Sequence, residues 1–112
     1  MSKNYKNWEL GYNFEVQLWC SEGDYDKVVA LIGEPTKQKI YKNNIMCKWF
    51  DDLKTLCELI IPNKSKLDSL KIEPQLWLYY LYEEQCNLEF DSEQLKLISE
   101  SGMCFCVTCL EE

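Results

Sequence analysis

One segment of the sequence, FDSEQLKLISESG at residues 90–102, carries a complete set of local signals for a helix. Asp91 is placed to cap the first turn, Gln94 completes a capping box, and Gly102 is suited to the end of the helix. The preceding run QLWLYYLYEE and the following run MCFCVTCL are rich in residues that favour strands. A helix between two strands packs against the sheet that they join, so the segment predicts a β–α–β unit.

The first half of the chain resembles this layout. The run NFEVQLWC at 13–20 alternates apolar and polar residues, which predicts a half-buried strand. The next run, DYDKVVALIG, predicts a helix with Asp24 at its N-cap and Gly33 in a left-handed conformation at its end. Two strand-like runs then flank Asn43-Asn44, and this pair is typical of a hairpin turn because asparagine tolerates positive φ.

The run DDLKTLCELII predicts another helix, and NKSKLDSLKI predicts a short one after it. The expected order is therefore β-α-β-β-α-β-α-β. We expect an α+β fold with a single mixed or antiparallel sheet of about five strands and helices on one face, a variant of the ferredoxin-like arrangement. The chain of 112 residues predicts one domain over 1–112, with an N-terminal extension at 1–12 and the core at 13–110.

The chain shows no signal for a membrane or for export. No apolar run approaches the roughly 20 residues that a membrane span needs. The first residues, MSKNYKNWEL, lack the apolar stretch of a signal peptide. We therefore expect a cytoplasmic protein without membrane association. Thiols stay reduced in the cytoplasm, and seven cysteines is an odd number, so a full disulfide framework is not expected.

Three of the cysteines, Cys104, Cys106 and Cys109, lie within six residues of each other. A strand places alternate side chains about 6.6 Å apart, too far for two ligands of one zinc ion, and Cys109 would face the opposite side. Histidine is absent from the chain, so no imidazole can ligate a metal or activate a nucleophile. We interpret the segment as a strand and expect no metal site, no cofactor, no catalytic residue and no enzyme activity.

Charge is unevenly distributed along the chain, whose net charge is −7 and which contains no arginine. Residues 36–50 hold four lysines and no acid, whereas residues 72–112 hold nine acids and one lysine. An acidic pole steers a basic partner and disfavours nucleic acid. The alternative is solvated surface charge that only aids solubility. The one candidate for nucleic acid is the hairpin from Lys37 to Lys48, together with Tyr41 and Trp49.

The aromatic residues of the strands suggest a binding surface. If Leu76 and Leu78 face the helices, then Trp77, Tyr79 and Leu81 face the opposite way. Exposed aromatic side chains mark interfaces, although the N-terminal segment or long side chains could instead cover them. The expected partner-binding residues are Trp19, Trp77, Tyr79 and Leu81, with the acids Glu15, Glu83 and Glu84 near the edge of the surface.

Four features resemble one known family. They are the alternating first strand, a short helix that runs into LIGEPTK, Trp49 within CKWF, and the closing run FDSEQLKLISESGMCFCV. Over residues 13–110 the chain resembles the small bacterial family catalogued as domain of unknown function four-two-seven-nine. The resemblance implies an α+β fold and a bacterial or phage origin, and it supplies no established activity. Between Pro35 and Trp49 this chain is shorter than is usual in the family, so a function of that loop is not carried over.

We therefore expect a non-enzymatic protein that binds and inhibits another protein. Its role is inferred only by analogy with small bacterial inhibitors. Two such roles are a toxin immunity protein and a phage-encoded inhibitor of a bacterial defence system. The alternative is a structural or regulatory homodimer that uses the same face of the sheet.

Overall fold

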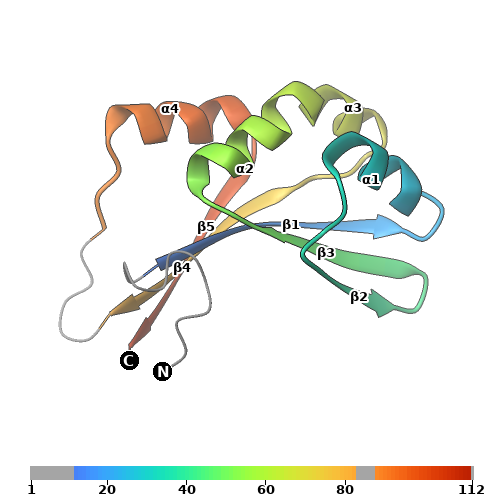
Figure 1. Cartoon of the computed structure of the whole chain (residues 1–112), viewed down its shortest axis with the longest axis horizontal. Helices are drawn as coiled ribbons and strands as arrows, with labels where there is room; N and C mark the ends of the chain where they lie inside the picture. Colours follow the sequence, from blue (N-terminus) through green and yellow to red (C-terminus); the bar gives the residue numbers. More distant parts are fainter. Residues whose placement is uncertain (1–11, 83–87, 112) are drawn as a thin grey trace.

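The computed structural model describes residues 12–82 and 88–111, and it shows one sheet with helices on one of its faces (Figure 1). The elements in chain order are β1 (Tyr12–Ser21), α1 (Tyr25–Ile32), β2 (Lys37–Tyr41), β3 (Asn44–Phe50), α2 (Leu53–Ile60), the 3₁₀ turn η2 (Ile61–Asn63), α3 (Lys64–Ser69), β4 (Gln75–Tyr82), α4 (Ser92–Ser101) and β5 (Cys104–Glu111). This order confirms the predicted α+β fold, with α3 as the expected short helix. Residues 1–11 of the predicted N-terminal extension lie outside the described residues.

The strands lie in the order β2-β3-β1-β4-β5. Neighbours are antiparallel except for β4 and β5, which are parallel. The first four strands with α1 and α2 therefore follow the βαββαβ path of the ferredoxin-like arrangement, as predicted. Helix α4 makes the crossover that a parallel pair requires and adds β5 at the edge of β4.

Local sequence explains where the helices begin and end in the second half of the chain. In α2 the Asp52 carboxylate accepts a hydrogen bond from the Thr55 amide at 2.8 Å. In α4 the predicted capping box forms, because Asp91 accepts from the Gln94 amide and the Gln94 side chain accepts from the Asp91 amide. Gly102 then ends α4 with φ 69° and ψ 9°, the left-handed conformation that glycine adopts without strain.

The first half departs from prediction at both ends of α1. Asp24 occupies the N-cap position, but its side chain makes no capping hydrogen bond because its backbone is already helical, with φ −96° and ψ −9°. The Ser21 hydroxyl instead accepts from the Asp24 amide at 3.2 Å. Gly33 has the predicted positive φ of 85°, but its ψ of 173° is extended rather than left-handed helical.

The predicted hairpin forms one residue earlier than expected. Its turn is Lys42-Asn43, and Asn44 already belongs to β3. Lys42 has φ 55°, whereas Asn43 is not among the residues with positive φ. A positive φ at the first turn position only is the pattern of a type II′ turn, whose twist matches the flanking strands. Pairing of β2 with β3 outweighed the ordinary preference for asparagine at such a φ.

The core lies between the sheet and the helices. The side chains of Phe14, Val16, Leu18 and Cys20 on β1 alternate inward and are buried, as the sequence pattern predicted. Trp49 on β3 is only 6% exposed, and its indole N–H donates to the carbonyl of Gly33 at 3.2 Å. This bond ties the end of α1 to the sheet. None of the helices in residues 12–82 and 88–111 is both long and apolar enough to cross a lipid bilayer.

Candidate interaction surface

The face of the sheet opposite the helices, here called the outer face, carries side chains from every strand. Paired residues on neighbouring strands point to the same side, so the strand register assigns them. They include Lys37, Lys39 and Tyr41 on β2, Met46, Lys48 and Phe50 on β3, Glu15, Gln17 and Trp19 on β1, Gln75, Trp77, Tyr79 and Leu81 on β4, and Cys104, Cys106, Thr108 and Leu110 on β5. Among these described side chains five are aromatic, three are lysines and one is acidic.

The aromatic side chains form two pairs on this face. The rings of Trp77 and Tyr79 stack, with centroids 5.9 Å apart and planes 17° apart. Towards the other edge of the sheet, Trp19 and Tyr41 lie with centroids 5.4 Å apart and planes tilted by 50°. Trp19 is 49% exposed, whereas Trp77, Tyr79 and Leu81 are partly buried. The sequence pattern thus placed Trp19, Trp77, Tyr79 and Leu81 on one face.

Of the acids predicted near the edge of the surface, only Glu15 belongs to the described residues, and it lies at the middle of the surface instead. Glu15 lies on β1, the central strand, with Phe50 and Trp77 as its register partners on either side, and it is only 4% exposed. Sequence alone missed this position because strand order decides which strand is central. Glu83 and Glu84 lie outside the described residues.

Glu15 is instead the acceptor of a polar network at the middle of the outer face. The Gln17 side-chain amide donates to the Glu15 carboxylate at 2.6 Å, and the same amide lies 3.1 Å from the Tyr79 hydroxyl. The Lys48 ammonium lies 3.7 Å from the Glu15 carboxylate. Burial raises the pKa of the Tyr79 phenol, and the Glu15 charge raises it further, so the hydroxyl stays protonated at neutral pH. These contacts fix the side chains between the two aromatic pairs.

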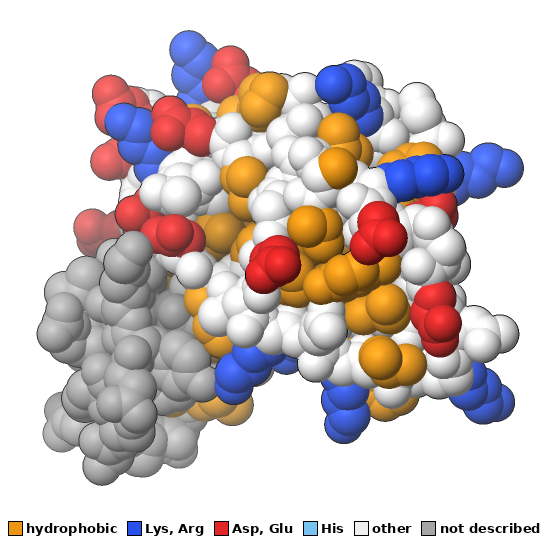
Figure 2. Space-filling view, turned by 45° about the vertical axis from the view of Figure 1, so that its right-hand side comes forward, with side chains coloured by type: hydrophobic (Ala, Val, Ile, Leu, Met, Phe, Trp, Pro, Cys, Tyr) orange, Lys and Arg blue, Asp and Glu red, His pale blue; other side chains and the backbone are white. Residues whose placement is uncertain are grey.

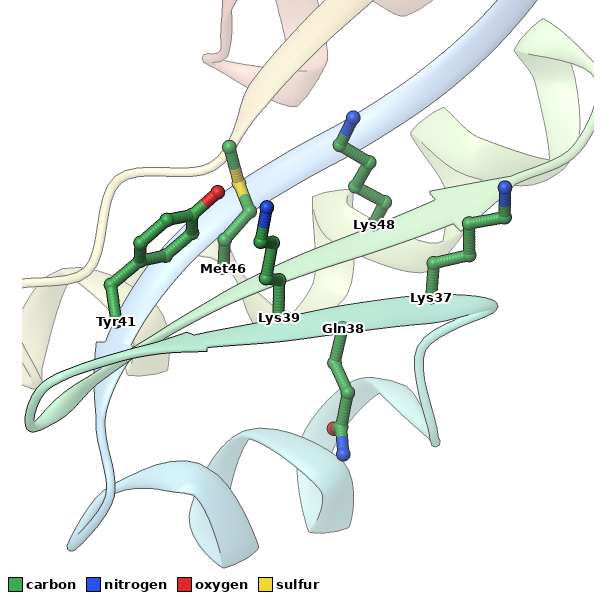
Figure 3. Close-up of a pocket in the computed structure, with 6 residues that line it drawn as sticks. All are labelled: Lys37, Gln38, Lys39, Tyr41, Met46 and Lys48. Atoms are coloured by element: carbon green, nitrogen blue, oxygen red, sulfur yellow. The ribbon is translucent and has the colours of Figure 1, made fainter.

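Lysines gather on the β2–β3 half of the outer face. Figure 3 shows Lys37, Lys39, Tyr41, Met46 and Lys48 projecting from the same side of the hairpin, and together they border a shallow depression of about 340 Å³. In Figure 2 lysines and acids are both spread around the molecule, with hydrophobic side chains nearer the middle of the view. Three lysines and no acid of the described residues line the depression, so its walls are positively charged.

Two of these lysines lie over aromatic rings. The Lys39 ammonium is 5.1 Å from the centroid of Tyr41, and the Lys37 ammonium is 5.8 Å from that of Phe50. Trp49, which the sequence pattern grouped with this hairpin, does not share the outer face but points into the core. The aromatic residue that accompanies Lys48 on the outer face is Phe50, as strict alternation along β3 would have indicated.

The cysteines of β5 lie as the strand pattern predicted, but their sulfur atoms are closer than the backbone spacing suggested. Cys104 and Cys106 share the outer face, and their Sγ atoms are 3.9 Å apart. Cys109 points to the other side of the sheet. The side chains therefore converge, and the expected separation of about 6.6 Å holds for the backbone only. Burial raises the pKa of Cys106, and the neighbouring Cys104 raises it further.

Three other thiols are buried. Burial raises the pKa of Cys47 to about 12 and that of Cys57 to about 11, and it also raises the pKa of Cys20. At neutral pH these thiols therefore stay protonated and are poor nucleophiles. Within residues 12–82 and 88–111, no cluster of three or more histidine, cysteine or acidic side chains is arranged to hold a metal ion.

Comparison of the chain with protein-family models, with curated proteins and with solved structures finds no match.

Proposed function

We propose that this chain is a non-enzymatic binding protein that recognises another protein through the outer face. The observation that carries the proposal is the grouping of Trp19, Tyr41, Trp77 and Tyr79 on one face of the sheet. Large, stiff aromatic side chains lose little rotamer entropy on binding and supply much of the energy of an interface.

The state of the outer face supports a surface that is ready to bind. Glu15, Gln17 and Tyr79 are joined by hydrogen bonds, so the side chains between the aromatic pairs are held in place before a partner arrives. A surface that is already ordered loses less conformational entropy on association. Trp19, with about half of its surface exposed, is the most accessible of the aromatic anchors.

The thiols support a role without covalent chemistry. A cysteine nucleophile needs a lowered pKa, and the pKa values of Cys20, Cys47 and Cys57 are all raised by burial. The partner-binding role that we propose is inhibition, as by a toxin immunity protein or a phage-encoded inhibitor of a bacterial defence system in the cytoplasm. We also propose that the chain is a member of the family catalogued as domain of unknown function four-two-seven-nine, which it resembles in sequence. Homodimerisation through the outer face is the alternative.

The experiment compares three purified variants with the parent chain. Trp19→Ala and Trp77→Ala each remove one anchor, and Leu95→Ala removes an apolar side chain that is 53% exposed on α4, on the opposite side of the sheet. Each protein is used as bait in its host extract with quantitative mass spectrometry, and the affinity for the retained protein is then measured by titration calorimetry. Sedimentation velocity of the bait alone reports self-association.

We expect one protein that the parent and Leu95→Ala retain equally and that either tryptophan variant binds about 30-fold more weakly, or by about 2 kcal/mol. Retention that is unchanged by both tryptophan substitutions would contradict the proposal. Concentration-dependent dimers that only the tryptophan variants lose would favour the homodimer. If Trp77→Ala lowers the melting temperature sharply, Trp19→Ala decides the result, because its exposed side chain contributes little to the core.

A further inference from the structure

The edge of the sheet at β2 is accessible along its whole length. In the described strand order β2 is an outermost strand, and all five of its residues are exposed. The hairpin turn has two residues, so Tyr41 and Asn44 form the hydrogen-bonded pair that closes it. Every second residue of β2 counted back from Tyr41 therefore directs its backbone N–H and C=O groups towards β3. Gln38 and Ile40 therefore direct their backbone N–H and C=O groups away from β3. Such an edge can accept an additional strand.

The two sides of this edge differ in chemistry. Lys37, Lys39 and Tyr41 project onto the outer face, whereas Gln38 projects towards α1 (Figure 3). Ile40 shares the side of Gln38 and is 60% exposed, which is a large exposure for an apolar side chain. The edge thus presents positive charge on one side and apolar surface on the other.

We propose that β2 binds an extended, acidic segment of the protein partner as an added strand, an inference that rests on the protein-binding function proposed above. Residues of an added strand alternate between the two sides, and directly opposed side chains lie about 5 Å apart. Acids at every second position meet Lys37 and Lys39, and the apolar residues between them cover Ile40. The chemistry of the site is therefore an alternating acidic and apolar strand.

Charge complementarity favours this occupant over a second copy of the chain. Pairing of β2 with another β2 would place lysines among lysines, and like charges that face each other across strands are destabilising. The other outermost strand, β5, contains no acid from residue 104 to residue 110. Nucleic acid would meet the lysines, but it offers no partner for the free backbone groups or for Ile40.

The net charge of −7 suggested a basic partner, whereas this edge selects an acidic one. Residues 36–50 contain four lysines and no acid, so the hairpin of β2 and β3 is itself positively charged. Exposed charges further away than the Debye length, about 8 Å at physiological salt, are largely screened. The local lysines therefore determine the attraction once the segment is close.

The test uses a fluorescein-labelled nine-residue peptide in which glutamate and valine alternate, titrated with the full chain in fluorescence anisotropy. The comparison peptide has the same composition with its glutamates in one block. Lys37→Glu/Lys39→Glu reverses the charge of the edge. Lys54→Glu/Lys66→Glu makes the same change of net charge on α2 and α3 and serves as the matched control.

We expect the alternating peptide to bind at least about tenfold more tightly than the blocked one. The β2 variant should lose at least about tenfold in affinity, while the helix variant and Trp77→Ala retain binding. Equal affinity for the two peptides, or equal losses in the two charge variants, would overturn the inference. If the peptide does not bind, but Trp19→Ala and Trp77→Ala weaken binding of the protein partner as expected above, only the β2 site is ruled out. The proposed function of the outer face would then still hold.

A backbone variant tests the added strand itself. Ile40→Pro removes the outward N–H, and Ile40→Ala keeps that N–H while removing the apolar side chain. Only the proline variant should abolish peptide binding, with both proteins folded by circular dichroism. If Ile40→Pro does not fold, a peptide methylated on alternate backbone nitrogens replaces it, and undiminished binding of that peptide would overturn the inference. Two other results would also overturn the inference. One is that a labelled 20-nucleotide oligothymidine binds through the same lysines more tightly than the alternating peptide does. The other is that the parent chain forms a dimer that Lys37→Glu/Lys39→Glu loses.

Discussion

The carboxylate of Glu15 lies 3.7 Å from the ammonium of Lys48 across the β1–β3 pair, on the face of the sheet that carries no helix of the described chain. The two ends of this ion pair differ in accessibility, since 5% of the Glu15 side chain and 34% of the Lys48 side chain are exposed. Water therefore reaches the cation but hardly the anion, and the acid depends on its protein partners.

Removal of Lys48 should be more harmful than removal of both charges. Lys48→Met leaves the Glu15 carboxylate with the Gln17 amide but without its cation, at a cost of about 1–2 kcal/mol in the free energy of unfolding. This is less than the 3–5 kcal/mol of a fully buried pair because solvent screens Lys48. In Glu15→Gln/Lys48→Met most of that loss should be recovered. Urea denaturation of the two single variants and the double variant checks this, and strictly additive losses would contradict it.

The buried thiols predict a loss of stability at alkaline pH. Unfolding returns Cys47 and Cys57 to the ordinary pKa of 9.0, whereas in the folded chain they titrate at about 12 and about 11. Above pH 9 the unfolded state releases protons that the folded state keeps, so the free energy of unfolding falls as pH rises from about 9 to 12. Below pH 9 their contribution is fully present.

Cys47→Ala/Cys57→Ala should show a shallower fall in stability between pH 8 and pH 10.5 than the parent chain, whatever its starting stability. Urea denaturation at each pH provides the slope. Leu95→Ala is the control, since its side chain is 53% exposed and carries no titratable group, so the slope should be unchanged. Identical slopes for all three proteins would rule out thiol burial as the cause.

The two glycines with positive φ should respond differently to asparagine. Gly102 is left-handed helical, a conformation that asparagine tolerates, so Gly102→Ala should cost about 1 kcal/mol and Gly102→Asn less. Gly33, at φ 85° and ψ 173°, lies in a region open almost only to glycine. Both Gly33→Ala and Gly33→Asn should therefore cost about 1–3 kcal/mol.

Thermal melts of these four variants test the assignment, with Gly23→Ala as the control. Gly23 does not have positive φ, and an added Cβ there would meet only ordinary contacts. A rescue of Gly33 by asparagine that matches the rescue of Gly102 would show that Gly33 is left-handed helical after all.

The capping box of α4 predicts a modest and local loss of stability. Asp91→Ala removes the acceptor of the 2.8 Å bond from the Gln94 amide and should lower the free energy of unfolding by about 1 kcal/mol. Asp91→Ser keeps a capping oxygen and should lose less. Chemical denaturation followed by circular dichroism measures both, and equal losses would mean that the cap contributes little.

Sequence patterns predicted those features that depend on neighbouring residues. The alternation of β1 and β4 gave the correct faces for Trp19, Trp77 and Tyr79, because side chains alternate along any strand. The capping box was readable since Asp91 and Gln94 lie three residues apart.

Features that depend on strand order were not readable. Glu15 is buried because β1 is central, and β2 is accessible because it is outermost. The hairpin shifted by one residue because pairing between β2 and β3 placed Lys42, rather than an asparagine, at the positive φ. Local preference favours a turn residue, but the register of a whole strand pair involves more contacts.

The described tryptophans lie on opposite sides of the sheet, Trp49 in the core and Trp19 and Trp77 on the outer face, and they make the protein its own spectroscopic sensor. Trp49 has its indole N–H on a carbonyl inside the core, while Trp19 has about half of its surface in water. Emission from Trp49 should lie at shorter wavelength and resist acrylamide quenching, whereas emission from Trp19 should be quenched readily. A ligand that covers the outer face would shift the emission of the outer-face tryptophans, whereas unfolding would also shift that of Trp49, so occupancy and integrity could be followed in one unlabelled sample.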